Sequence, residues 1–176
     1  MKAKINDIKY KINGFDPFAY QNLFYEYKLK ITDAEINQVF LLTKDVNTKY
    51  HKTTYENLNV LNFPILKKLK RQITNILDNH KLLLSNNWAQ LYNEGDLHKI
   101  HIHEGSVYSG IIYINGLKPN PTIFYDSSFK KYEHNFKKNT LIMFPSSIPH
   151  EVETLKKNQG RLIISFNTQR KNVIVK

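Results

Sequence analysis

The sequence predicts a mostly β protein, an antiparallel barrel or jelly roll, with helices in its N-terminal part. From about residue 82 to residue 167, short runs rich in β-branched and aromatic residues follow one another, separated by turn signals. Before residue 82, one segment has the three- and four-residue apolar spacing of a helix. We therefore expect a single domain over residues 1–176, in which a mixed part, 1–81, packs on a β core, 82–176.

The mixed part is predicted to begin with two strands and a helix. The strands are expected at Ile5–Ile12 and Asn22–Ile31. The four residues Thr32–Glu35 have the pattern of a helix capping box. The apolar face of the helix that follows would consist of Ile36, Phe40 and Leu41. The polar segment 45–59 is expected to be a loop.

The clearest helix pattern covers Phe63–Leu77, and Pro64 suits its first turn. Its apolar face would consist of Phe63, Leu66, Leu69, Ile73 and Leu77. The opposite face carries Lys67, Lys68, Lys70 and Arg71. Such a cluster is typical of a solvated helix face, and it is also compatible with contact to a polyanion.

The net charge is +11, and two interpretations of it stay open. The lysines are spread along the chain, and Asn and Ile are also abundant, which indicates a compositional origin such as an AT-rich coding sequence. A charge of this size also favours attraction to nucleic acid or another polyanion. The sequence does not indicate an oligomeric state.

The absence of cysteine excludes disulfides, thiolate metal sites and a cysteine nucleophile. It favours a reducing, cytoplasmic compartment, which would be the host cytoplasm for a viral protein. No apolar run reaches the roughly 20 residues that cross a bilayer. The first residues lack the apolar stretch of a signal peptide. We therefore expect no membrane partner.

Seven strands are predicted in the β core. They are Leu83–Tyr92, His98–His103, Val107–Asn115, Thr122–Tyr125, Leu141–Phe144, Glu151–Leu155 and Arg161–Asn167. The turn signals between them are Asn93–Asp96, Asn115-Gly116, Pro119–Pro121 and Asn158–Gly160. Many short strands at such spacing predict a jelly roll that follows the helices.

A pair of histidines lies on the second of these strands. Because successive side chains of a strand point to opposite faces, His101 and His103 share one face. Ile100 and Ile102 would pack behind them, and His98 would lie on the isoleucine side, so that it is not expected to be a ligand. Two aligned imidazoles suit iron, zinc, copper or nickel.

A third histidine and an arginine follow in the later strands. His150 opens a strand after a proline-bounded turn, and Arg161 comes eleven residues further on. Alternation places Arg161 and Ser165 on the same face of the last strand. An arginine that faces into a small barrel needs an anionic partner, because an unpaired buried charge is prohibitive. That partner is either a bound carboxylate, which arginine holds through two hydrogen bonds, or a nearby Asp or Glu.

These residues, in this order, resemble the 2-oxoglutarate/Fe(II)-dependent dioxygenase superfamily. Its pattern is H-x-D, a distal His and then an Arg or Lys, and here the matching elements are His101-Ile102-His103, His150 and Arg161. Gln90–Gly95 resembles the N-x-Y-x-x-G segment that precedes H-x-D. Ser109–Tyr113 resembles the S-G-V-Y-Y strand of a bacterial and phage branch that also carries H-x-H and F-P-S. The resemblance covers roughly residues 83–167.

The resemblance implies a double-stranded β-helix, a cupin-like jelly roll, and a hydroxylase that uses Fe(II), O₂ and 2-oxoglutarate and releases succinate and CO₂. The metal ligands would be His101, His103 and His150. Residues that bind 2-oxoglutarate would be Arg161, Tyr92, Ser165, Tyr113 and Gln90. The prime substrate is not indicated.

One position departs from the superfamily pattern, since His103 stands where the family has Asp. Glu104 is the alternative third ligand, because Gly105 ends the strand and a bulge there would turn the carboxylate inward. Two other functions stay open. One is a cupin-like metal dioxygenase that does not use 2-oxoglutarate, although the cupin Glu and a later cupin glycine are absent. The other is a non-catalytic jelly-roll module that binds a polyanion.

Overall fold

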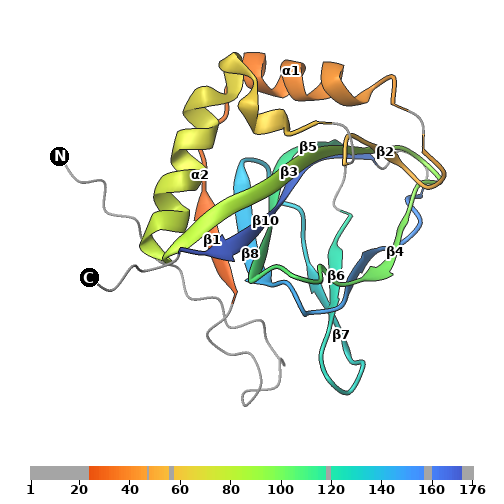
Figure 1. Ribbon diagram of the computed structural model, residues 1–176. Helices are drawn as coiled ribbons and strands as arrows, with labels where there is room; N and C mark the ends of the chain where they lie inside the picture. The colour runs from red at the N-terminus through yellow and green to blue at the C-terminus, as the bar shows by residue number, and fades with distance from the viewer. Residues whose placement is uncertain (1–23, 47, 56–57, 118–119, 157–159, 172–176) are drawn as a thin grey trace, which may run out of the picture.

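The computed structural model describes residues 24–46, 48–55, 58–117, 120–156 and 160–171. In these residues, ten strands form two antiparallel sheets, and two α-helices cover the outer face of the larger sheet. Figure 1 shows α1 and α2 on one side of this sheet and β4, β6 and β7 on the other. The predicted strand at Ile5–Ile12 lies outside the described residues.

The larger sheet has six strands. In spatial order they are β1 (Tyr25–Lys28), β8 (Thr140–Pro145), β5 (Tyr108–Leu117), β10 (Gly160–Arg170), β3 (Leu82–Tyr92) and β2 (Lys52–Thr53). The smaller sheet has four, in the order β4 (His98–His101), β9 (His150–Val152), β6 (Thr122–Tyr125) and β7 (Lys131–His134). The mostly β, antiparallel fold class is confirmed. The mixed N-terminal part also supplies β1 and β2, the two edge strands of the larger sheet.

The side chains of the larger sheet divide between two cores. On β10, Leu162, Ile164 and Phe166 point toward the helices, and Ile163 points toward the smaller sheet. This is the alternation that the sequence predicted for β10. The core between the sheets is largely aromatic and β-branched, and it contains Tyr92, Ile111, Tyr113, Phe124, Ile142, Phe144, Ile148, Val152, Leu155 and Ile163. Arg161 and Ser165 share this inner side of β10.

Helix α1 (Asp33–Thr43) begins with the predicted capping box. The Thr32 hydroxyl accepts a hydrogen bond from the Glu35 backbone N–H, and the Glu35 side chain accepts one from the Thr32 N–H. The predicted apolar face was wrong in part, because Phe40 is 44% exposed and Leu41 55% exposed. The buried stripe instead consists of Glu35, Ile36, Val39 and Thr43. Thr43 is tolerated inside because its hydroxyl donates to the Val39 carbonyl.

Helix α2 (Lys67–Asn79) follows two 3₁₀ turns, η1 (Val60–Asn62) and η2 (Pro64–Leu66). The predicted helix at Phe63–Leu77 therefore begins as a 3₁₀ turn at Pro64 and continues as α2. Its predicted apolar face is confirmed, with Leu66, Leu69, Ile73 and Leu77 buried against the larger sheet. Neither described helix is long and apolar enough to span a bilayer.

Two predictions about a turn and a loop were wrong, and one strand was missed. Asn115-Gly116 is not a turn but lies within β5, where Ile114 is an extra residue that bulges opposite Leu162 and Ile163. Strand β7 was missed, since its sequence, Lys131–His134, is short and mostly polar. The segment 45–59 contains the two-residue strand β2.

The capping box of α1 gives a prediction about stability. Thr32→Ala removes the hydroxyl that satisfies the Glu35 N–H, so the free energy of unfolding should fall by about 1 kcal/mol. In a chain of this size, this lowers Tm by roughly 2–4 °C. The matched control is Thr74→Ala on α2, where the hydroxyl only donates to the Arg71 carbonyl on an exposed face. Thermal unfolding that affected both variants equally would contradict the role of the cap.

Candidate metal centre and its pocket

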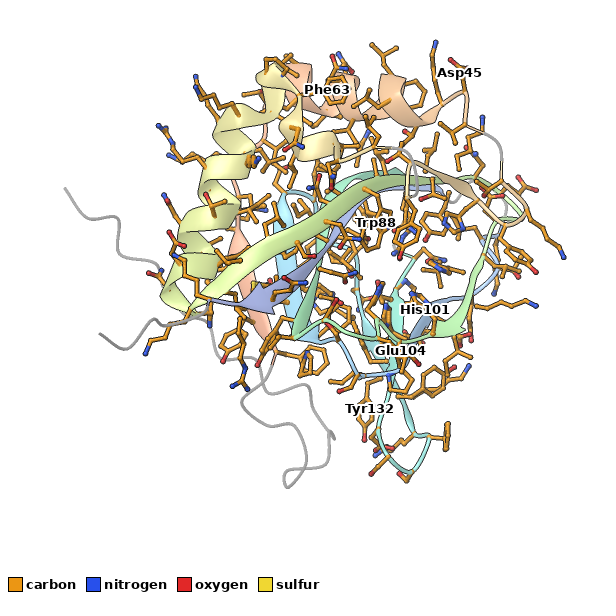
Figure 2. The ribbon with its side chains drawn as sticks, in the orientation of Figure 1. Asp45, Phe63, Trp88, His101, Glu104 and Tyr132 are labelled. Carbon is orange, nitrogen blue, oxygen red and sulfur yellow. The ribbon has the colours of Figure 1, made fainter. Side chains whose placement is uncertain are left out.

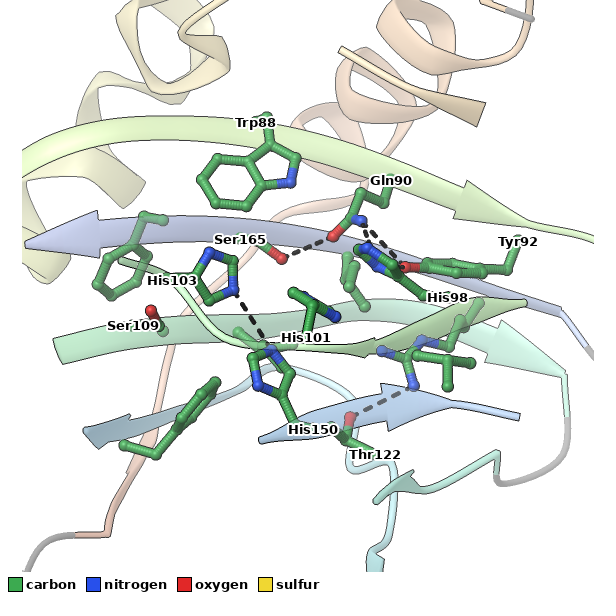
Figure 3. Close-up of a pocket in the computed structure, with 17 residues that line it drawn as sticks. Trp88, Gln90, Tyr92, His98, His101, His103, Ser109, Thr122, His150 and Ser165 are labelled. Atoms are coloured by element: carbon green, nitrogen blue, oxygen red, sulfur yellow. Dashed lines mark hydrogen bonds between the residues drawn. The ribbon is translucent and has the colours of Figure 1, made fainter. Parts of the chain in front are cut away.

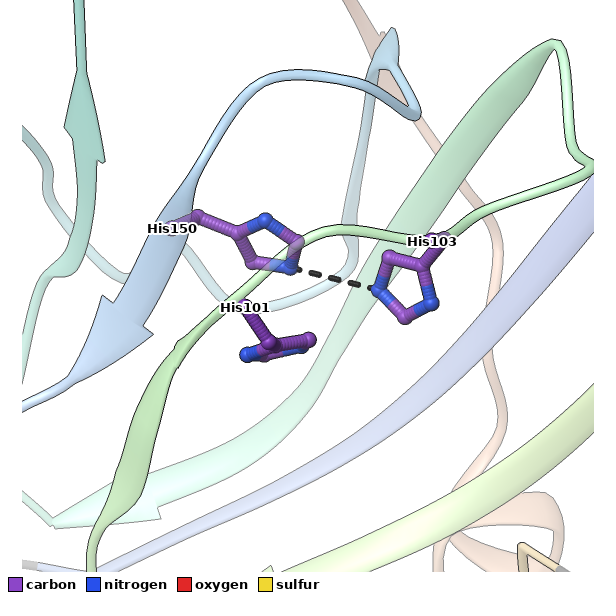
Figure 4. A group of neighbouring side chains, drawn as sticks. All are labelled: His101, His103 and His150. Carbon is purple, nitrogen blue, oxygen red and sulfur yellow. Dashed lines mark hydrogen bonds between the residues drawn. The ribbon is translucent and has the colours of Figure 1, made fainter.

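Three histidines meet between the two sheets. His101 ends β4, His150 begins β9, and the two are paired in the strand register. His103 follows β4, where its backbone N–H donates to the Ser146 carbonyl at 2.9 Å. One ring nitrogen from each of His101, His103 and His150 lies within 4.8 Å of the others (Figure 4). This spacing suits a single metal ion on one face of three imidazoles.

Backbone carbonyls fix the orientation of two of these rings. The His101 Nδ1 donates to the Lys99 carbonyl at 2.8 Å, and the His150 Nδ1 donates to the Ile148 carbonyl at 3.0 Å. Since a carbonyl only accepts, Nδ1 carries the proton and the Nε2 lone pair is free in both rings. The Nε2 atoms of His103 and His150 are 3.3 Å apart. The His103 Nε2–H therefore donates to His150, and a metal ion would take the place of this hydrogen bond once the His103 proton moves to Nδ1.

Burial keeps the three rings neutral. It lowers the pKa of His103 to about 4, with the neighbouring His101 as the second cause. Burial also lowers the pKa of His101, against a smaller opposing effect of the Lys99 carbonyl, and it holds the pKa of His150 well below its usual value. Neutral imidazole is the form that binds a metal, so these histidines need no deprotonation at pH 7.

Glu104, the alternative third ligand, is not part of this group. Its side chain is exposed, and it is not among the residues that could share a metal (Figure 2). The structure thus brings His103, and not Glu104, to His101 and His150. Ile100 and Ile102 are 46% and 42% exposed, so the prediction that they pack behind the histidines was wrong.

The prediction for His98 was also wrong in its direction. Its ring lies in the pocket, stacked on His101 with 4.0 Å between centroids. The register of β4 with β9 shifts between His98 and His101, and this irregularity breaks the alternation on which the prediction rested. The Tyr92 hydroxyl donates to His98 Nδ1 at 3.1 Å. His98 is therefore a pocket residue beside the three-histidine group and not a member of it.

Arg161 lies in the same pocket, 2% exposed, without an acidic partner among the described residues. Figure 3 shows this pocket, with His98, His101 and His150 among the residues that line it. Its Nη1 makes only long contacts, 3.5 Å to the Asn120 carbonyl and 3.4 Å to the Thr122 hydroxyl. Its Nε has no hydrogen-bond partner. The guanidinium group lies over the rings of Tyr92 and Tyr113, 5.0 and 5.9 Å from their centroids. These neutral contacts compensate only part of the desolvation of a buried charge.

The other predicted pocket residues form two hydrogen-bonded groups. The Ser165 hydroxyl donates to Gln90 Oε1 at 2.8 Å, and Gln90 Nε2 donates to the Tyr92 hydroxyl at 3.0 Å. All three line the pocket. Tyr113 does not line it, since its hydroxyl bonds instead to Thr122, at 2.9 Å, and to His134.

Sequence reasoning missed several residues of this site. His51 stacks on Tyr92 at 4.5 Å and accepts a hydrogen bond from Gln90 Nε2. Thr122 touches Arg161, and Trp88 lies beside His103 with 5.8 Å between ring centroids. The alternation of β3 would have identified Trp88, since it shares a face with Gln90 and Tyr92. Nothing local in the sequence marks His51, which lies in a polar loop.

Comparison with known proteins identifies the fold. No family model and no curated protein sequence matches the chain. Among solved structures, a viral collagen prolyl hydroxylase of Paramecium Bursaria Chlorella virus-1, in complex with 2OG, has a TM-score of 0.63 at 11% identity, over 84% of this chain and 96% of that one. A Pseudomonas putida prolyl-4-hydroxylase has a TM-score of 0.58 at 14% identity, over 84% and 92%.

A third structure is that of HygX from Streptomyces hygroscopicus with nickel, 2-oxoglutarate and hygromycin B bound. It has a TM-score of 0.63 at 10% identity, over 85% of this chain and 83% of that one. The fold of the chain is thus the double-stranded β-helix of the 2-oxoglutarate/Fe(II) oxygenases, as the sequence resemblance implied. At such low identity the likeness defines the fold alone.

The three-histidine group predicts which variants lose metal. His101→Ala and His150→Ala should each abolish Fe(II) binding, because the two remaining imidazoles are too few ligands to hold the ion. His98→Ala and Glu104→Ala should keep it. Trp88 is the only tryptophan of the chain, so quenching of its fluorescence reports metal at His103. Loss of metal in Glu104→Ala but not in His103→Ala would show that Glu104 is the ligand.

The buried histidines also predict a pH dependence of stability. Burial lowers the pKa of His51, His98, His101, His103 and His150, that of His98 to about 2. Between pH 6.5 and about 4, the unfolded chain binds protons at these sites that the folded chain does not, so stability falls as pH falls.

Each histidine contributes up to about 1.4 kcal/mol per pH unit over this window. Urea unfolding of the metal-free protein at pH 7, 6 and 5 measures the slope. The variant His98→Gln, which retains a polar group but does not titrate, should have a shallower slope than the wild type. An unchanged free energy of unfolding between pH 7 and pH 5 is incompatible with neutral, buried histidines.

Proposed function

We propose that this protein is an Fe(II)- and 2-oxoglutarate-dependent dioxygenase that hydroxylates its substrate and releases succinate and CO₂. The observation that carries the proposal is the buried Arg161 guanidinium, which has no acidic partner among the described residues and shares a pocket with His101, His103 and His150. A metal ion and an arginine in one cavity fit the two ends of a 2-oxo diacid. The fold, which the chain has in common with 2-oxoglutarate oxygenases, supports the same proposal.

The residues of the chain fit the missing groups. Three neutral imidazoles are suitable ligands for Fe(II) and leave further coordination positions open. When bound, the iron and 2-oxoglutarate supply the oxidising chemistry. Arg161 would hold the far carboxylate of 2-oxoglutarate. This carboxylate would be the anionic partner that Arg161 lacks among the described residues, and the hydrogen bonds between them would be charge-assisted. Thr122, already 3.4 Å from Arg161, would donate its hydroxyl to the same carboxylate.

The tyrosine, serine and glutamine of the site would position the 2-oxoglutarate. Tyr92 packs under the guanidinium group, and its hydroxyl is oriented by Gln90 and His98. Ser165 is held by Gln90 on the neighbouring strand β3. This network is buried, so it keeps bulk water from the reacting atoms and holds each polar group in one direction. Tyr113 would position Thr122 and Arg161, because its hydroxyl is hydrogen-bonded to Thr122 and its ring lies against the guanidinium group.

The far end of the pocket, away from Arg161, would take the prime substrate. It is lined by uncharged residues, including Trp88 and Ser109. A neutral group of the substrate would fit this end better than a charged one. Contact with nucleic acid rests only on the net charge of +11. We place the activity in the cytoplasm, because the chain has no cysteine.

The proposal predicts how Arg161 variants bind 2-oxoglutarate. Loss of a charge-assisted, two-pronged contact costs on the order of 1.5–3 kcal/mol. Arg161→Ala should therefore raise the 2-oxoglutarate concentration for half-maximal succinate formation at least ~10-fold. Arg161→Lys should recover part of this loss, as a point charge without the fork geometry. Metal affinity should change little.

A stability measurement separates this role from a structural one. If Arg161 serves a ligand, Arg161→Met removes an unpaired buried charge and should leave the ligand-free protein equally stable or more stable. If Arg161 is instead the partner of a structural ion pair, Arg161→Met should destabilise the protein by about 3–5 kcal/mol. An unchanged half-saturation point in Arg161→Ala would leave the 2-oxoglutarate proposal without support from its key residue. It would favour the cupin-like alternative.

A further inference from the structure

The proposed metal ligands carry no negative charge. His101, His103 and His150 are the only described residues that could share an ion, and no Asp or Glu lines the pocket. Glu104, next to His103 in the chain, is exposed. The remaining charged residue of the pocket is Arg161, a cation. The pocket is therefore built from neutral and positive groups alone.

This composition leaves a bound metal without charge compensation. An imidazole that ligates a metal is neutral, so a divalent ion on three histidines keeps its full charge of +2. A carboxylate at position 103 would reduce that charge to +1. In a buried pocket the difference matters more than in water, because the effective dielectric constant is lower. The negative charge that the protein does not supply must come with the cosubstrate.

We propose that the metal ion and the 2-oxo acid bind this chain as a strongly coupled pair, because His103 leaves the neutralisation of the metal to the cosubstrate. This inference rests on the proposed function and adds to it a coupling between the binding of the metal ion and that of the cosubstrate. Each ligand alone binds weakly, and each raises the affinity of the other by the same factor. His103 is the residue that sets this factor, since it occupies the place where a carboxylate would weaken the coupling.

Nickel titrations that follow Trp88 fluorescence measure the coupling without turnover. The nickel affinity of the wild type should rise on the order of 100-fold in saturating 2-oxoglutarate, toward the upper end of typical couplings. In His103→Asp, nickel alone should bind more tightly, and 2-oxoglutarate should raise its affinity by less than about 10-fold. The matched control is Glu104→Gln, which removes a neighbouring but exposed carboxylate and should keep the wild-type factor.

A second variant covers the case in which the shorter Asp side chain does not reach the metal. His103→Ala opens the third position, which added imidazole fills as a neutral ligand and added formate fills as an anion. The same titration should then give a large coupling factor with imidazole and a small one with formate. The protein and the position are identical in the two arms, which differ only in the added ligand, a neutral imidazole or an anionic formate.

The outcomes separate this inference from the proposed function. If nickel and 2-oxoglutarate both bind the wild type but independently, the coupling is absent and the inference is overturned, although the proposed function stands. Equal factors for wild type and His103→Asp, or for imidazole and formate, overturn it as well. If the wild type binds no nickel with or without 2-oxoglutarate, the proposed function fails together with the inference.

Discussion

The desolvated guanidinium group of Arg161 is the constraint on which the rest of the pocket depends. β10 lies inside the larger sheet, hydrogen-bonded to β3 on one side and β5 on the other, so Arg161 cannot turn its charge toward solvent. Two tyrosine rings, one hydroxyl and one carbonyl are its neighbours, and none of them is an anion. Burial of a cation in such surroundings lowers the stability of the protein unless a bound anion compensates the charge. The histidines of β4 and β9, in the smaller sheet, lie in the same pocket as Arg161. The pocket therefore has one end that suits an anion and one end that suits a metal ion.

The strands explain how much of this site could be predicted from the sequence. Where β10 pairs regularly with β3, over residues 161–166, alternation alone is sufficient: Arg161 and Ser165 point inward and Leu162 and Ile164 outward, as predicted. The short motif Ser109-Gly110 also has a physical reason, because a Cβ atom on Gly110 would come within 2.2 Å of the Phe166 ring. The order of the motifs predicts that His101, His103 and His150 lie together, and the structure brings one ring nitrogen of each within 4.8 Å of the others.

Irregular pairing explains what could not be predicted. The shift in register on β4 turns His98 into the pocket, which no count along an ideal strand can indicate. Strand β5 continues through Asn115-Gly116 because of the bulge at Ile114, although this dipeptide is typical of a turn. His51 reaches the site from a polar loop through long-range contacts with Tyr92 and Leu97. Each of these depends on tertiary pairing between segments far apart in the chain, and local sequence carries no signal for it.

The most direct test of the proposed function asks whether one cavity holds both a metal and a 2-oxo acid in contact. Fe(II) and 2-oxoglutarate are added to the metal-free protein under anaerobic conditions, and the visible spectrum is recorded. A 2-oxo acid that chelates iron through its keto oxygen and carboxylate gives a metal-to-ligand charge-transfer band. The band should appear in the wild type and be lost in His150→Ala. A wild-type spectrum without the band, while both Fe(II) and 2-oxoglutarate are bound, would contradict the proposed function.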